Sequence, residues 1–179
     1  MESTAELIEK LYSKDNKVAY QALQMLETES EKSNKVYKFL HKFSEMIENS
    51  NSYMRTRGIV LIAANAKWDT ENKIDEIIDD YLKHILDEKP ITARQCIKAL
   101  PRIARYKSDL VECIREALMK ANVSIYGDSM QTLLYKDISY ALKKIKWQIP
   151  ICLMRETSLL CGLVNKYFKN LWHHPYWRL

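Results

Sequence analysis

The sequence predicts an all-α protein, an α–α superhelix of about four helix pairs with a capping helix at its C-terminal end. Segments that open a helical pattern recur at intervals of 35, 39 and 37 residues, beginning at Asn16, Asn51, Pro90 and Gly127. A period in this range is typical of stacked helix pairs, in which each pair buries its apolar stripe against its neighbours. Only three glycines and four prolines occur among 179 residues, too few for many tight turns.

The composition, 47% hydrophobic and 28% charged, is that of an ordinary globular protein. The first residues lack the basic flank and apolar run of a signal peptide, and no run is apolar enough to span a membrane. We therefore expect a cytoplasmic protein without a membrane contact. The four cysteines lack CxxC spacing and a neighbouring histidine, which favours small buried side chains over disulfides: Cys96, Cys113, Cys152 and Cys161.

The first two predicted helices cover residues 4–12 and 16–29. Ser3 followed by Glu6 is a capping-box pattern, in which hydroxyl and carboxylate satisfy backbone amides reciprocally. The Glu-rich residues 28–32 are expected to form an exposed turn. A third helix follows from residue 33 and ends at the polar turn over residues 49–52.

The fourth predicted helix covers residues 53–66 and contains Gly58, which costs about 1 kcal/mol of helix propensity relative to alanine. A close approach of two helices would explain a glycine at this position. Asp69 or Thr70 is expected to cap the fifth helix, whose apolar stripe is Ile74, Ile77, Ile78, Tyr81, Leu82 and Ile85.

Pro90 is suited to the first turn of the sixth helix, and Pro101 within that helix predicts a kink near Ile97. Helices over residues 108–121 and 128–146 complete the pattern, since both have apolar residues at helical spacing.

The segment Thr92-Ala-Arg-Gln-Cys-Ile-Lys-Ala-Leu-Pro-Arg-Ile resembles the second helix of a HEAT repeat, in the armadillo-like group of α-solenoids. Met54-Arg55, Gly58 and Leu61 match the same pattern more loosely, and the resemblance covers about residues 4–146. It implies an α-solenoid whose second helices line the concave side. It hardly constrains function, because HEAT-like stacks include scaffolds, adaptors, nucleic-acid binders and DNA glycosylases.

We expect a boundary between a repeat domain over residues 1–146 and an extension over residues 147–179. The extension contains a single acid, Glu156, and is rich in aromatic residues. One interpretation is that residues 153–171 form a helix covering the open end of the stack, as terminal repeats require. The alternative is a poorly packed extension, even one arising from a shifted reading frame.

The best functional signal is the placement of cations opposite the apolar stripe of the sixth helix, without an acid in that helix: Arg94, Lys98, Arg102 and Arg105. The fourth helix adds Arg55 and Arg57, and the last adds Lys136, Lys143 and Lys144. If second helices stack side by side, these cations form a basic strip that attracts an acidic segment or a polyanion. The alternative is a solvated face, partly paired with acids of adjacent helices.

Trp68, between Lys67 and Asp69, is a second candidate binding residue at one rim of the stack. The structural alternative is that Trp68 fills the gap between repeats while Asp69 caps a helix.

No phosphate loop, nucleophile elbow, zinc-protease motif or Cys/His dyad occurs, and the histidines have no preorganised metal-ligand pattern. We therefore expect a protein without enzymatic activity, cofactor or metal that binds an acidic protein segment. The alternative is a nucleic-acid binder similar to the HEAT-like alkylpurine DNA glycosylases, although no catalytic residue of that family has a counterpart here. The sequence does not specify an oligomeric state.

Overall fold

A computed structural model describes residues 2–146, which form eight α-helices and five short 3-10 helices without a strand. This confirms the predicted all-α class for the described part of the chain. The α-helices are α1 (Thr4–Lys10), α2 (Asn16–Lys32), α3 (Leu40–Ile47), α4 (Ser52–Asn65), α5 (Lys73–Lys83), α6 (Pro90–Tyr106), α7 (Val111–Lys120) and α8 (Asp128–Lys146). The 3-10 helices are η1 (Tyr37–Phe39), η2 (Ala66–Trp68), η3 (His84–Leu86), η4 (Ser108–Leu110) and η5 (Val123–Ile125). The predicted capping helix lies outside the described residues.

Local side-chain hydrogen bonds explain where the helices begin. Ser3 and Glu6 form the predicted capping box of α1, and the side chains of Asp15 and Asn51 accept hydrogen bonds from backbone amides at the starts of α2 and α4. The residue preceding α5 is Asn72, in the left-handed conformation at φ 57°. Asp69 still caps α5, because its carboxylate accepts hydrogen bonds from the amides of Lys73 and Ile74.

Several predicted boundaries are wrong: α1 ends at Lys10 rather than residue 12, and α7 begins at Val111 rather than residue 108, after the 3-10 turn η4. The turn expected over residues 28–32 is helical, since α2 continues to Lys32. Thr28 and Ser30 donate their hydroxyl hydrogens to carbonyls one turn earlier, and Ser30 is buried, so these polar residues are accommodated within the helix. The α-helix expected from residue 33 begins only at Leu40, after the 3-10 turn η1.

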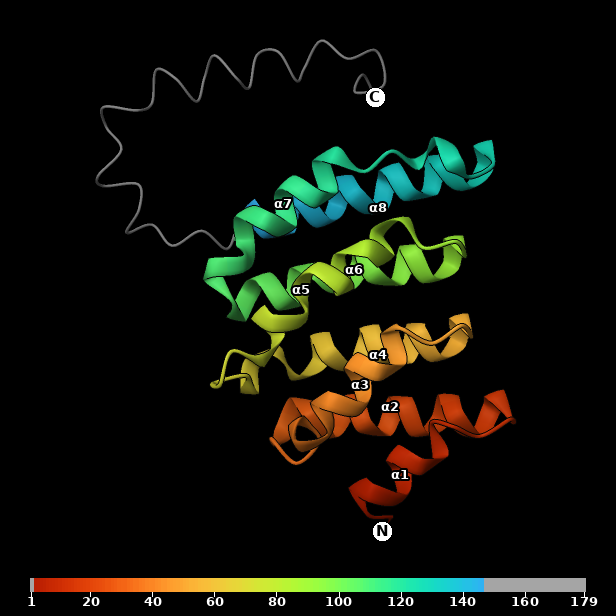
Figure 1. Cartoon of the computed structure of the whole chain (residues 1–179), viewed down its shortest axis with the longest axis vertical. Coiled ribbons are helices and arrows are strands. Elements are labelled where there is room, and N and C mark those ends of the chain that lie inside the picture. Colours follow the sequence, from red (N-terminus) through yellow and green to blue (C-terminus); the bar gives the residue numbers. More distant parts are fainter. Residues whose placement is uncertain (1, 147–179) are drawn as a thin grey trace, which may run out of the picture. The chain divides into compact units, whose positions relative to one another are not determined.

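The even-numbered helices form a row in chain order, because α2 contacts α4, α4 contacts α6 and α6 contacts α8. α1, α3 and α7 pack against the helices that follow them, and α6 packs against η3, which directly follows α5. The tiers of residues 2–146 therefore rise from α1 and α2 to α7 and α8 (Figure 1). α6 continues through Pro101 to Tyr106.

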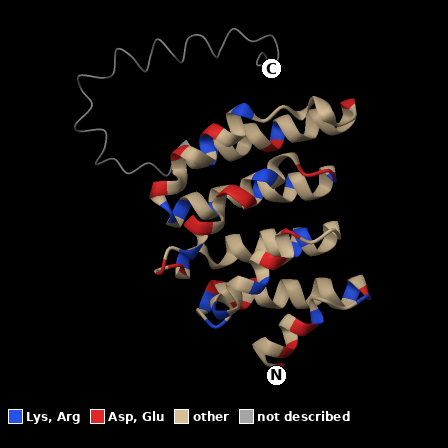
Figure 2. Ribbon diagram, viewed as in Figure 1, with Lys and Arg blue, Asp and Glu red and all other residues tan. Residues whose placement is uncertain are grey.

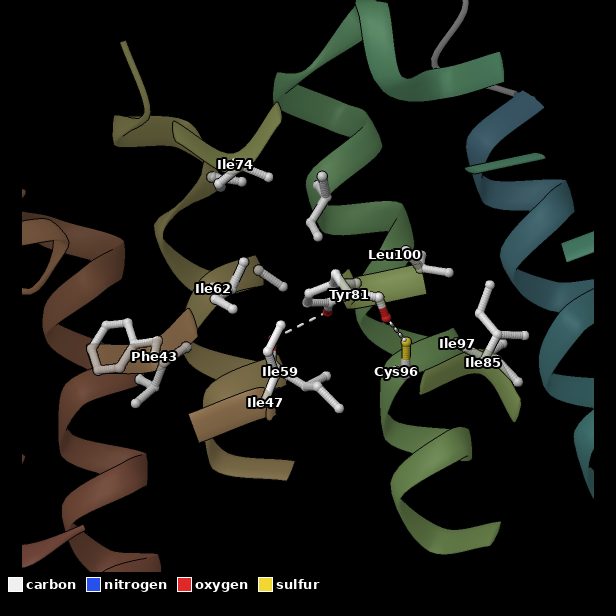
Figure 3. Close-up of a cluster of buried hydrophobic side chains, with 14 of the residues drawn as sticks. Phe43, Ile47, Ile59, Ile62, Ile74, Tyr81, Ile85, Cys96, Ile97 and Leu100 are labelled. Carbon is white, nitrogen blue, oxygen red and sulfur yellow. Dashed lines mark hydrogen bonds between the residues drawn. The ribbon is translucent and has the colours of Figure 1, made fainter. Parts of the chain in front are cut away.

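One apolar cluster extends through these tiers, from Leu7 in α1 to Ile145 in α8. In its centre the fully buried Tyr81 donates its hydroxyl hydrogen to the carbonyl of Ile59, and Cys96 donates to the carbonyl of Tyr81 (Figure 3). Cys96 is thus a buried side chain as predicted, whereas Cys113 is exposed. Cys152 and Cys161 lie outside the described residues.

Gly58 lies where α3 and α4 approach each other closely. A Cβ atom at this position would lie 2.7 Å from the carbonyl oxygen of Phe43 and 2.9 Å from the Cβ of Met46. The close helix approach expected from the sequence is therefore confirmed.

Candidate protein-interaction surface

The α6 basic face consists of the four cations that the sequence places opposite the buried stripe of this helix: Arg94, Lys98, Arg102 and Arg105. The stripe itself is fully enclosed by α4, α8 and η3, which leaves the cations at the solvent boundary. Figure 2 shows that acidic residues also occur on the neighbouring tiers. The partners of each cation therefore decide what the face is able to bind.

Asp137 of α8 neutralises one end of the α6 basic face. Arg94 donates from Nε to its carboxylate at 2.6 Å, and Lys98 Nζ lies 3.7 Å from the same carboxylate. The hydrogen bond from Arg94 raises the pKa of this arginine. Lys98 remains 46% exposed, so it is accessible to a further anion.

Arg102 pairs with acids on α2, across the intervening helix α4. Its Nη1 lies 3.3 Å from the Glu27 carboxylate, and its Nη2 lies 3.9 Å from that of Glu31. Partial burial raises the pKa of Glu27 although Arg102 opposes this shift. Arg105 is exposed, and its guanidinium carbon lies 5.5 Å from the centre of the Tyr106 ring.

One face of α8 adjoins the α6 basic face, because Asp137 contacts both Arg94 and Lys98. Tyr140 and Lys144 lie three and seven residues beyond Asp137, on the same side of the helix. The Lys144 amino group lies 5.4 Å from the centre of the Tyr140 ring. The α6–α8 surface, defined as the α6 basic face with Asp137, Tyr140 and Lys144, thus combines five cations, one paired acid and an exposed aromatic ring.

Arg55, a predicted strip residue, lies in the interior and is 6% exposed. It donates to both carboxylate oxygens of Asp87, at 2.7 and 2.8 Å, and to the carbonyls of Asn49 and Ser50. Its hydrogen bonds to Asp87 raise the pKa of Arg55. Burial alone would raise the pKa of Asp87, but hydrogen bonds from Arg55, the Lys89 amide and His84 outweigh it and lower this pKa.

Arg57, the second predicted strip residue on α4, is also 6% exposed. It donates to the carbonyl of Leu11 at 2.6 Å and to the side chain of Asn16 at 3.1 Å. Burial lowers the pKa of Arg57. The strip therefore does not extend over α4, since α4 is packed between α2, α3 and α6.

Trp68 connects the ends of α2 and α4, as in the structural interpretation of this residue. Its indole nitrogen donates to the carbonyl of Ser30 at 2.7 Å, while Lys67 donates to the carbonyl of Glu31 and lies over the indole ring. The carboxylate of Asp69 is held by the α5 amides and by the hydroxyl of Tyr37.

Lys107 is a buried cation that the sequence analysis did not single out. It lies 3.0 Å from the Asp69 carboxylate and 2.6 Å from that of Asp75, at the junction of α5 and α6. Its only sequence signal is a lysine directly after an amphipathic helix, which is common on protein surfaces. Asp137, Glu27 and Glu31 were also missed, because their partners lie far along the chain.

Within residues 2–146, no group of three or more His, Cys, Asp or Glu side chains has a metal-binding arrangement. No helix of this part of the chain has the length and hydropathy needed to cross a bilayer. No protein-family model, curated protein sequence or solved structure matches the chain.

Proposed function

We propose that this protein is a HEAT-like superhelix of helix pairs that binds an acidic segment of a partner protein on the α6–α8 surface. The row of α2, α4, α6 and α8 supports the first part, because adjacent second helices are the arrangement that a repeat of this period produces. The alignment of four cations along one side of α6 carries the second part.

A carboxylate of a partner protein is able to replace Glu27 and Glu31 as the partner of Arg102. Glu31 is 68% exposed, Glu27 is 36% exposed, and both lie more than 3 Å from Arg102. Exposed pairs of this kind contribute about 0–1 kcal/mol, so a carboxylate from a partner replaces them at little cost. Lys98, Arg105 and Lys144 supply further positive charge, and Tyr140 offers an exposed ring for an apolar partner residue.

A protein segment fits this surface better than a nucleic acid does. Asp137, Glu27 and Glu31 lie among the cations and repel a continuous phosphate backbone, whereas a peptide alternates acidic and neutral side chains. Arg55 and Arg57 are in the interior and leave fewer cations for phosphate contacts.

Binding of a labelled peptide rich in Glu and Asp to the full chain tests the proposal, beside a matched peptide of Gln and Asn. The double variant Lys98→Glu/Arg105→Glu is expected to lose about tenfold or more in affinity, equivalent to about 1.4 kcal/mol. Its matched control is Lys83→Glu/Lys120→Glu, which reverses two exposed lysines on α5 and α7 and is expected to bind like the wild type.

Equal weakening by both double variants, or no preference for the acidic peptide, would contradict the proposal. Tighter binding of duplex or single-stranded oligonucleotides, with an affinity that falls steeply as salt increases, would favour the nucleic-acid alternative instead.

A further inference from the structure

We propose that the cleft beside Arg57 binds a small oxyanion, a phosphate or carboxylate group of a soluble ligand. The cleft has a volume of about 440 Å³ and lies between the segment from Tyr12 to Asn16 and the segment from Asn49 to Met54, with Arg57 in its wall. It is a separate site from the α6–α8 surface, and the inference does not depend on the proposed function.

The three buried cations of residues 2–146 differ in their partners. Arg55 has the carboxylate of Asp87, and Lys107 has those of Asp69 and Asp75. Arg57 is as deeply buried as either, yet no carboxylate of the described residues pairs with it. Burying a charge without a counterion is costly, so a bound anion would supply what Arg57 lacks.

The guanidinium of Arg57, which lines the cleft, retains donor capacity. Nη1 donates to the Leu11 carbonyl and contacts the sulfur of Met54, and Nη2 donates to Asn16. Nε donates to no residue of the described chain. Five N–H donors in a planar fork suit the oxygens of a carboxylate or phosphate, and three such contacts leave part of the fork available.

The rest of the cleft is also suited to an anion. Lys14 adds a second cation, while Asn16, Asn49 and Tyr53 contribute amides and a phenol that are able to donate hydrogen bonds. No Asp or Glu lines the cleft. Asp15 is adjacent in sequence, but its carboxylate accepts a hydrogen bond from the Lys17 amide at the start of α2.

Two helices begin at this cleft, which strengthens its positive potential. Asn16 is the first residue of α2, and Asn51 precedes the first residue of α4; both line the cleft. The partial positive charge of a helix N-terminus favours an anion nearby. The volume is within the range of pockets for small molecules, so the oxyanion is expected to be part of a compact, polar ligand.

Titration of the full chain with inorganic phosphate and, separately, with acetate and citrate tests this site at constant ionic strength. We expect a saturable rise in Tm and saturable shifts of the Arg57 Nε–H resonance in ¹H–¹⁵N spectra, with a Kd of about 1 mM or tighter. The anion with the lower Kd identifies the group, phosphate or carboxylate, that the site prefers.

Lys14→Gln is expected to weaken binding about threefold or more, because Lys14 lines the cleft. Lys17→Gln removes an exposed cation of the same helix start that does not line it, and is expected to leave the Kd unchanged. Arg57→Gln is expected to abolish binding. Because that variant also changes a buried residue, its fold is checked by circular dichroism, and Lys14→Gln decides the question if Arg57→Gln unfolds.

The absence of a saturable response to all three anions would overturn the inference, as would equal weakening by Lys17→Gln and Lys14→Gln. The same applies if Lys98→Glu/Arg105→Glu removes anion binding while Lys14→Gln does not, because the anion would then bind the α6–α8 surface. Failure of this test leaves the peptide test of the proposed function unaffected.

Discussion

At the scale of single residues, the positions that tolerate least change are those where two helices share space or a buried charge. Gly58 and Arg55 are three residues apart on α4 and represent these two cases. A Cβ atom added at Gly58 would meet the Phe43 carbonyl oxygen of α3, while Arg55 holds Asp87 and the carbonyls of the turn before α4. Space limits replacement at Gly58, and the set of hydrogen bonds limits it at Arg55.

Gly58→Ala is expected to destabilise the protein by about 1–2 kcal/mol, although alanine has the higher helix propensity. The added methyl group would meet the Phe43 carbonyl oxygen, a backbone atom that moves only with its helix. Gly127→Ala is the matched control, because no atom lies within 4 Å of its added methyl group. Denaturant unfolding measures both variants, and a larger loss at Gly127 would contradict the proposed packing constraint.

Arg55→Lys is expected to cost about 2 kcal/mol, since an ammonium cannot make the paired contacts with Asp87 and also reach two carbonyls. Arg94→Lys is its control at the surface, where Asp137 is the partner, and is expected to cost less than about 1 kcal/mol. Thermal and denaturant unfolding compare the two. Similar losses of stability in the two variants would mean that burial of the ion pair between Arg55 and Asp87 adds little to the free energy of unfolding.

At the scale of helices, polar side chains set many of the helix boundaries. The boundaries that depend on neighbouring residues are the ones that the sequence predicts. The start of α2 at Asn16 and the start of α6 at Pro90 agree with the sequence, because a cap or a first-turn proline acts locally. The end of α2 was not predicted: Ser30 is buried there, and its carbonyl accepts a hydrogen bond from Trp68, which lies 38 residues away. Local patterns contain no information on such a contact.

The candidate site, like the helix boundaries, was predictable where it depends on local sequence and not where it depends on distant contacts. The alignment of cations on α6 follows from helical spacing alone, and the structure retains it. Their partners could not be predicted, because Arg94 and Asp137 are 43 residues apart and Arg102 and Glu27 are 75 residues apart. The interior position of Arg55 and Arg57 likewise depends on how α4 packs between its neighbours.

Lys107→Met is expected to destabilise the junction of α5 and α6 by about 3 kcal/mol, because it leaves Asp69 and Asp75 without their cation. Lys83→Met removes an exposed lysine of α5 and should change stability very little. Hydrogen exchange of the α5 amides, compared with the free energy of global unfolding, distinguishes a local loss of stability from a global one. Unchanged protection of the Lys73 and Ile74 amides would contradict the assigned role of this network.

At the scale of the whole described domain, one apolar cluster extends through the tiers, and buried ion pairs add to it at two places. Arg55 and Asp87 join the start of α4 to the loop before α6, and Lys107 joins the end of α6 to α5. A stack of this kind depends on contacts between neighbouring tiers, so loss of one ionic contact is expected to weaken two tiers together. The protonation state of Asp69 and Asp87 is therefore relevant to the stability of the entire stack.

Acid is expected to destabilise the domain through these two carboxylates. Hydrogen bonds outweigh burial and hold the pKa of both Asp69 and Asp87 below the ordinary value, 3.8. A carboxyl group with a lowered pKa in the folded state stabilises the fold fully above its unfolded pKa of about 3.9, and loses this contribution as the pH falls through the folded pKa. The free energy of unfolding should therefore be steady near neutral pH and decrease below about pH 4 to 5.

Asp87→Asn distinguishes this cause from general acid unfolding. The variant is expected to be less stable than the wild type at pH 7, because Arg55 loses its counterion, and the difference should shrink as acid protonates Asp87 in the wild type. Glu27→Gln is the matched control, since Glu27 has a raised pKa and its ionisation contributes with the opposite sign. Denaturant unfolding from pH 7 to acid measures all three proteins; a constant gap between wild type and Asp87→Asn would show that its charge is not what stabilises the stack.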